Sequence, residues 1–128
     1  MPREDFDALL DCTVEQIWVW ADSIRLVIDL GQDAEPSTYV DVHSESELTH
    51  GSNRATLDAR AKPDEAGAVL HLLNERITSA IALDGVLQLS FAGGAELTSP
   101  PHEQYESWTV VLGGRVFQCM PGGEVDSW

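Results

Sequence analysis

The sequence predicts an α+β domain with a mainly antiparallel sheet, built from two weakly repeated helix–hairpin halves with two helices. Two observations support this fold class: an internal repeat with an offset of 63 residues, and alternating apolar runs separated by turn sequences. The 128 residues suit one domain, and 43% of them are hydrophobic, which suffices for a core. We expect a single domain, 1–128, with pseudo-repeat halves at about 1–62 and 63–128.

The repeat is visible when Leu9–Ile28 is aligned with Leu72–Phe91. The apolar pattern is kept although most residue identities differ, so that Val14, for example, aligns with Ile77. Each half is therefore expected to contain the end of a helix, a strand, a tight turn and a second strand.

Apolar residues at helical spacing follow Pro63 and two acidic residues, and both features suit the amino terminus of a helix. The first half has a shorter version of the same pattern. We therefore expect two helices, with apolar stripes formed by Ala66, Val69, Leu70 and Leu73 in one and by Phe6, Leu9 and Leu10 in the other.

Turn sequences separate the alternating runs. Asp84-Gly85 is a strong hairpin signal, and Ala21–Ser23 occupies the equivalent place in the first half. Gly93-Gly94 and Gly113-Gly114 also lie between alternating runs and predict hairpin turns.

Alternation with a period of two also predicts which strand face is buried. The opposite face of the first strand still carries Ile17 and Val19, so a homodimeric structural module that covers them is one alternative. The residues expected to face the core are Val14, Trp18 and Trp20 in the first half and Ile77, Ile81 and Leu83 in the second.

The net charge of −15 is unevenly distributed, with 12 acidic and two basic residues in positions 1–47. Such a field repels nucleic acid and anionic membranes, and it attracts a basic protein. We expect a basic partner to bind the first half, through Asp29, Asp33, Glu35, Asp41, Glu45 and Glu47.

The amino terminus is acidic and no apolar run approaches the length of a membrane span, so a cytoplasmic location is expected. In that compartment Cys12 and Cys119 are expected to be reduced thiols.

Two groups of residues could carry chemistry. Asp41, His43, Glu45 and Glu47 alternate and could face one metal ion, but no recognised ligand spacing occurs, so no metal or other cofactor is expected. His102, Glu103, Tyr105 and Glu106 could supply acid and base groups, and with Trp108 they form a possible small-ligand site.

The carboxy-terminal third contains Tyr105-Glu106-Ser107-Trp108, then Cys119–Gly123 with the sequence CMPGG, and a closing Trp128; Asp84–Phe91 lies upstream. This pattern resembles an uncharacterised family of small bacterial proteins with a Tyr-Glu-x-Trp signature. The resemblance implies a small two-part β-rich fold and no known activity. It leaves two roles open for the signature, a fold-specifying cluster or a small-ligand site.

We therefore expect a non-enzymatic acidic protein-binding domain. Its most concrete form is an immunity protein that neutralises a basic toxin such as a nuclease, an analogy that rests on small size and acidity. The alternatives are a small-ligand or metal-dependent enzyme that uses His102, Glu103 and Glu106, or the homodimeric module.

Overall fold

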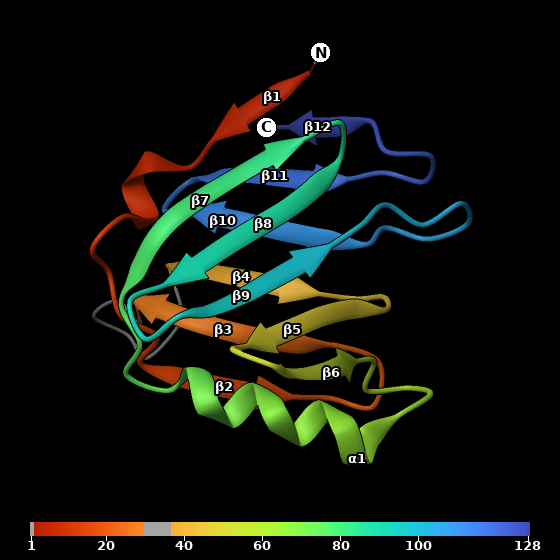
Figure 1. The fold of residues 1–128 in the computed structure, drawn as a ribbon. Helices are drawn as coiled ribbons and strands as arrows, with labels where there is room; N and C mark the ends of the chain where they lie inside the picture. Colours follow the sequence, from red (N-terminus) through yellow and green to blue (C-terminus); the bar gives the residue numbers. More distant parts are fainter. Residues whose placement is uncertain (1, 30–36) are drawn as a thin grey trace.

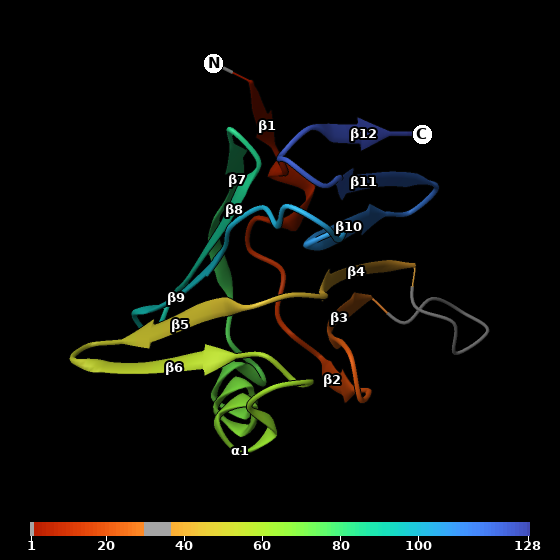
Figure 2. The ribbon, with the colours of Figure 1, turned by 90° about the vertical axis from the view of Figure 1, so that its right-hand side faces the viewer.

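The computed structural model describes residues 2–29 and 37–128, whose strands form two antiparallel sheets with one apolar core between them (Figure 1 and Figure 2). Sheet 1 contains, in spatial order, β1 (Arg3–Asp5), β7 (Ile77–Leu83), β8 (Val86–Phe91), β9 (Ala95–Ser99), β5 (Ser46–His50) and β6 (Asn53–Leu57). Sheet 2 contains β12 (Val125–Ser127), β11 (Arg115–Cys119), β10 (Trp108–Leu112), β4 (Thr38–Val42), β3 (Ile24–Asp29) and β2 (Gln16–Val19).

The fold is largely all-β, so the predicted α+β class with two helices is wrong. The helix expected in the second half consists of one α-helical turn, α1 (Pro63–Ala66), followed by a 3₁₀ helix at Gly67–Leu72. In the first half, the predicted helix is replaced by a short 3₁₀ turn at Asp7–Leu9. No helix in the described part of the chain is long and apolar enough to span a membrane.

The 3₁₀ geometry explains which apolar residues are buried. Side chains three positions apart lie on the same face of such a helix. Accordingly, Ala66, Val69 and Leu72 are buried, whereas Leu70 is 56% exposed and Leu73 is 40% exposed. The apolar spacing in the sequence was compatible with both helix types, and packing against the sheets selected the three-residue period.

The four turn predictions are confirmed. β2 pairs with β3, and β7 pairs with β8 around Asp84-Gly85, where both residues have positive φ angles of 52° and 81°. Gly93-Gly94 separates β8 from β9, and Gly113-Gly114 separates β10 from β11.

In the first strand of each half, the predicted buried face is wrong beyond the first residue of the pattern. The backbone N–H of Glu15 donates to the carbonyl of Val27, although Gln16 is the register partner of Val27. Two consecutive residues therefore face one, and this bulge shifts the alternation by one position. Trp18 and Trp20 consequently face outward. An irregularity between Ile77 and Ser79 does the same in β7, where Ala80 and Ala82 are buried in place of Ile81 and Leu83.

The offset of 63 residues recurs in the backbone hydrogen bonds that join the two halves. The N–H of Asp11 donates to the carbonyl of Ile77, and the N–H of Asn74 donates to the carbonyl of Val14. Asp11 and Asn74, which the offset relates, both have a φ of 67°. The topology follows the same pattern, because each half places three strands in one sheet and then two in the other. In the first half β2 to β4 belong to sheet 2 and β5–β6 to sheet 1, and in the second half β7 to β9 belong to sheet 1 and β10–β11 to sheet 2.

Aromatic rings occupy the part of the core nearest the amino terminus. Phe6 contacts Trp108 and Phe117 edge to face, with ring centroids 6.1 and 5.2 Å apart. Phe6 and Trp108 are at most 1% exposed, and Phe117 is also buried. These contacts tie the amino-terminal segment to both strands of the β10–β11 hairpin.

Candidate functional site

Sheet 2 carries a group of aromatic side chains on its outer face. The bulge before β2 turns Trp18 and Trp20 outward, where they meet Arg25 of β3 and Tyr39 of β4. The guanidinium carbon of Arg25 lies 3.8, 5.0 and 5.7 Å from the ring centroids of Tyr39, Trp20 and Trp18. These distances permit cation–π attraction to all three rings. We call these four residues the aromatic cluster.

Asp41 fixes the charged centre of the aromatic cluster. The Nε and Nη2 atoms of Arg25 donate to the two carboxylate oxygens of Asp41, at 2.7 and 2.9 Å. The side chains of Arg25 and Asp41 are 20% and 10% exposed. The hydrogen bonds with Asp41 raise the pKa of the Arg25 guanidinium above its ordinary value, and burial opposes them. Arg25 is therefore a permanent cation held in one orientation.

Beyond Asp41, in the neighbouring strands, the outer face of sheet 2 is less exposed to solvent. Thr109 is the register partner of Asp41, and its hydroxyl contacts His43 at 3.1 Å and Gln118 at 3.3 Å. Val27 and Val111, at 0% and 8% exposure, are buried although they do not belong to the core cluster. This part of the outer face is therefore covered by the chain itself.

The aromatic cluster is only partly covered by the chain. Trp20 is 43% exposed, and Trp18 and Tyr39 are half-buried. Trp, Tyr and Arg are enriched among the residues that contribute most to protein–protein binding, and Trp and Tyr bury large areas in few conformations. The cluster can therefore present a rigid aromatic surface to another protein.

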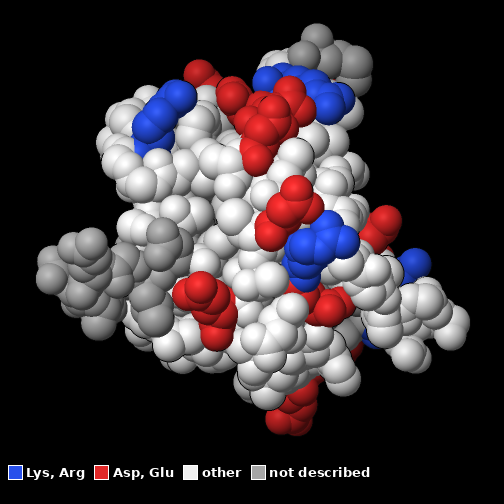
Figure 3. Space-filling view, turned by 90° about the vertical axis from the view of Figure 1, so that its left-hand side faces the viewer, with Lys and Arg blue, Asp and Glu red and all other residues white. Residues whose placement is uncertain are grey.

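Three of the acidic residues predicted to bind a partner have described side chains, and these three do not form one surface. Asp41 is buried in its ion pair, whereas Glu45 and Glu47 are exposed. Asp29 lies at the end of β3, and Asp33 and Glu35 lie outside the described residues. Figure 3 shows acidic side chains at several separate places on one face, some of them beside basic ones.

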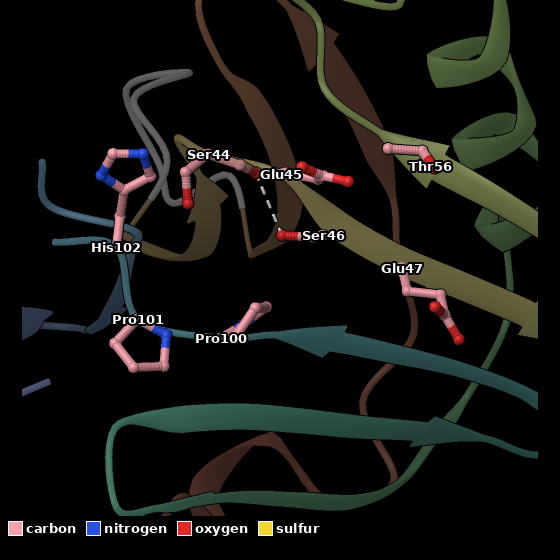
Figure 4. Close-up of a pocket in the computed structure, with 8 residues that line it drawn as sticks. All are labelled: Ser44, Glu45, Ser46, Glu47, Thr56, Pro100, Pro101 and His102. Carbon is pink, nitrogen blue, oxygen red and sulfur yellow. Dashed lines mark hydrogen bonds between the residues drawn. The ribbon is translucent and has the colours of Figure 1, made fainter.

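Glu45 and Glu47 instead line a polar hollow with His102, of about 260 Å³, at the point where the chain crosses from sheet 2 to sheet 1 (Figure 4). Ser46 lies beneath it and donates a hydrogen bond of 2.8 Å to Ser99. In Figure 4, His102 and Glu47 lie at opposite ends of the hollow. The carboxylates and the imidazole therefore do not converge on one reacting atom, and the hollow suits binding of a polar molecule better than acid–base catalysis.

The alternating Asp41, His43, Glu45 and Glu47 do not share one strand face, because β4 ends at Val42 and β5 begins at Ser46 in the other sheet. Among the described residues, no group of three or more His, Cys, Asp or Glu side chains is arranged to hold a metal ion.

The five residues of the predicted ligand site do not line one common hollow, although two of them are in contact. The ring of Tyr105 lies 4.8 Å from that of His102, and the Nδ1 atom of His102 accepts a hydrogen bond from the backbone of Gln104. Glu103 and Glu106 are exposed, and Trp108 is fully buried. Tyr105 and Glu106 line a second hollow, of about 200 Å³, together with Asp22, His43, Arg60 and Gln118.

Trp108 serves the fold. Its Nε1–H donates to the carbonyl of Gly85 at 2.9 Å, and the thiol of Cys119 donates to the same oxygen at 3.4 Å. Gly85 in turn lies against Gly123, since a Cβ atom added to Gly85 would be 2.5 Å from the carbonyl oxygen of Gly123. The DG, YExW and CMPGG segments therefore meet in one buried cluster, whereas Tyr105 and Glu106 of the same signature remain at the surface.

Sequence reasoning missed the aromatic cluster because it assigned Trp18 and Trp20 to the core. One signal was available, because the apolar residues on both faces of β2 required a cover on each side. What could not be read was the bulge that decides which face receives the tryptophans.

The fold and these surfaces define a small all-β domain of two antiparallel sheets, with an aromatic outer face on sheet 2. The model of the family of unknown function DUF6188 matches residues 7–128, and the chain belongs to this family. The expectation of an uncharacterised family is thus confirmed, and the match includes most of the first half. No curated protein and no solved structure matches the chain.

Proposed function

We propose that this protein is a non-enzymatic binding domain for a basic protein, and that the outer face of sheet 2 is its contact surface. The observation that carries the proposal is the aromatic cluster, in which Arg25 is fixed by Asp41 while Trp20 is 43% exposed. An exposed aromatic side chain braced by its neighbours costs little entropy when a partner covers it.

The charge of the surface supports a basic partner. Five of the seven basic side chains are paired with carboxylates, in the pairs Arg3–Asp5, Arg25–Asp41, Arg54–Glu47, Lys62–Glu65 and Arg76–Asp11. The charges that remain are therefore overwhelmingly negative. Asp22 and Glu106 line the hollow that adjoins His43 and Gln118 on the outer face of sheet 2. Carboxylates at the rim of an aromatic surface favour encounter with a cationic protein.

Neutralisation of a basic toxin, such as a nuclease, is the most concrete form of this function. A protein that covers a basic active site with carboxylates and an aromatic anchor would exclude the nucleic acid substrate. In this function the chain acts by binding alone and uses no catalytic residue and no cofactor.

The test is affinity capture from the native host with three immobilised proteins: the unaltered chain, Trp20→Ala, and Trp128→Ala as a control. Trp128 is 64% exposed, directly follows β12 and lies away from the aromatic cluster. We expect a basic protein on the unaltered chain and on Trp128→Ala but not on Trp20→Ala. Retention of only acidic proteins, or equal retention by all three, would show that the proposal is wrong.

A second candidate is binding of a small polar molecule in the hollow of Figure 4, favoured by two carboxylates and one imidazole around about 260 Å³. Glu45→Gln together with His102→Ala should then abolish binding of that molecule without affecting protein capture. Equilibrium dialysis against small cations and amines from host extract is the measurement.

A further inference from the structure

Within residues 2–29 and 37–128 the two sheets have four edge strands, and three of them are protected against further pairing. In β1 every residue is charged, since it reads Arg3-Glu4-Asp5. β6 contacts α1, and the N–H of Thr56 donates to the carboxylate of Glu65 at 3.2 Å. β12 is only three residues long and contains Asp126. Short length, charge and a covering helix are the ways in which proteins protect sheet edges from unwanted strand pairing.

The fourth edge, β2, is also short, at four residues, but no charged side chain protects it. It reads Gln-Ile-Trp-Val, without a charged residue or a proline, and in Figure 1 and Figure 2 it forms the lower margin of sheet 2. Val19 is 58% exposed, and the neighbouring Trp20 is 43% exposed. An uncharged apolar edge of this kind can accept a further strand.

The hydrogen-bonding pattern identifies the free backbone groups. The N–H of Trp20 donates to the carbonyl of Ser23 across the hairpin. Because bonded and non-bonded positions alternate along an antiparallel pair, Gln16 and Trp18 also bond to β3, and Ile17 and Val19 point away from it. No backbone hydrogen bond to another described segment occupies Ile17 or Val19.

The negative charge around β2 favours a basic segment over a second copy of this chain as the added strand. A second copy of this chain would bring another net charge of −15. Glu15 and Asp22, the exposed acids at the two ends of β2, would then lie near acids of the other copy. A basic segment would meet the same acids as attractive partners. Side chains of an added strand would also continue the outer face on which Trp18 lies.

We infer that the edge of β2 is the docking site for an extended segment of the basic partner, which adds to sheet 2 as a seventh strand bonded to Ile17 and Val19. This inference rests on the proposed function and names the recognition mode. Backbone hydrogen bonds would supply the pairing, and the aromatic cluster and flanking carboxylates would select the side chains.

The probe is an eight-residue peptide of alternating lysine and valine, blocked at both ends. Its control is the same peptide with N-methylated valines, which keeps the charge and removes half of the backbone donors. We expect the probe to slow amide hydrogen exchange of Ile17 and Val19 by at least about tenfold while Trp18, already bonded to β3, changes little. The methylated peptide should bind at least about tenfold more weakly.

Two variants complete the test. Val19→Pro removes the edge donor at a position where an edge strand tolerates proline, whereas Val19→Thr keeps the donor and the branched shape. We expect Val19→Pro to weaken peptide binding about tenfold and Val19→Thr to leave it unchanged. Exchange data on the unaltered chain do not depend on whether Val19→Pro folds.

Other results would separate the two proposals. Binding that protects neither Ile17 nor Val19, but is lost in Trp20→Ala, overturns the edge inference and leaves the proposed function standing. Failure of the unaltered chain to bind any cationic peptide or protein overturns both. A dimer in sedimentation equilibrium, with Ile17 and Val19 protected before peptide is added, overturns the inference in favour of a second copy.

Discussion

Replacing Asp41 by alanine removes one partner of the ion pair at the centre of the aromatic cluster. Arg25 then keeps its charge but loses two hydrogen bonds, at 2.7 and 2.9 Å, in a place where its side chain is only 20% exposed. The guanidinium cannot release its proton to avoid the cost. The protein should therefore become less stable.

The expected loss follows from burial. Exposed ion pairs contribute less than about 1 kcal/mol, whereas removal of one partner from a fully buried pair costs about 3–5 kcal/mol. The Asp41 side chain is 10% exposed, so the pair lies closer to the buried limit without reaching it. We expect Asp41→Ala to lower the free energy of unfolding by about 2–3 kcal/mol.

The matched control is Glu47→Ala. Glu47 also pairs with an arginine, Arg54, at 3.3 Å, but the two side chains are 48% and 72% exposed. Its replacement should change the free energy of unfolding by less than about 0.5 kcal/mol. Urea denaturation followed by tryptophan fluorescence measures both variants under the same conditions.

A double-mutant cycle isolates the pair itself. In an Arg25→Met background, which keeps an unbranched chain against Tyr39, the cost of Asp41→Ala should fall by at least about 1 kcal/mol because no buried cation remains. The reasoning is refuted if Asp41→Ala costs no more than Glu47→Ala, or if its cost is the same with and without Arg25.

Two further predictions concern the buried cluster around Gly85. Gly85→Ala should destabilise the domain by about 2–4 kcal/mol, because φ is 81° and the new Cβ atom would lie 2.5 Å from the Gly123 backbone. The control Gly113→Ala, where φ is 61° and the space is open, should cost only about 1 kcal/mol. Equal losses of stability in thermal unfolding would contradict this reasoning. Burial raises the pKa of the Cys119 thiol, so at neutral pH a thiol reagent should modify Cys12 alone in the folded chain and both cysteines in urea. Rapid modification of Cys119 in the native protein would contradict the structure.

Local signals in the sequence were enough to predict the hairpins. Asp84-Gly85 and the glycine pairs at 93–94 and 113–114 adopt the turns that their residue types favour, since these positions include positive φ angles at Gly85, Gly94 and Gly113. The conformation of a tight turn depends on two to four neighbouring residues, so it can be predicted even when the fold class is predicted wrongly.

The helices and the strand faces could not be predicted in the same way. An apolar residue at every third or fourth position fits both an α-helix and a 3₁₀ helix, and only packing against the sheets placed Leu72 inside and Leu70 outside. The bulge at Glu15 and Gln16 leaves no mark in the apolar pattern, yet it moves Trp18 and Trp20 from the core face to the surface.

The candidate site was predicted only in part, because its contacts are not local. Arg25 and Asp41 are 16 residues apart, and their ion pair depends on the register between β3 and β4. Asp41 was therefore expected among the free acidic residues although it is structurally paired. Trp108 was expected as either a structural or a ligand-binding residue, and its hydrogen bond to Gly85, 23 residues away, supports the structural role.

The central claim is that a basic protein binds the outer face of sheet 2 through the aromatic cluster. The most direct measurement is the association and dissociation kinetics of the captured partner with the unaltered chain and with Trp20→Ala, at about 0.05 and 0.5 M salt. Opposite charges mainly speed encounter, so association should slow with salt for both proteins, whereas loss of the aromatic anchor should speed dissociation at least about tenfold. Association that is insensitive to salt, or equal dissociation rates for the two proteins, would contradict the account.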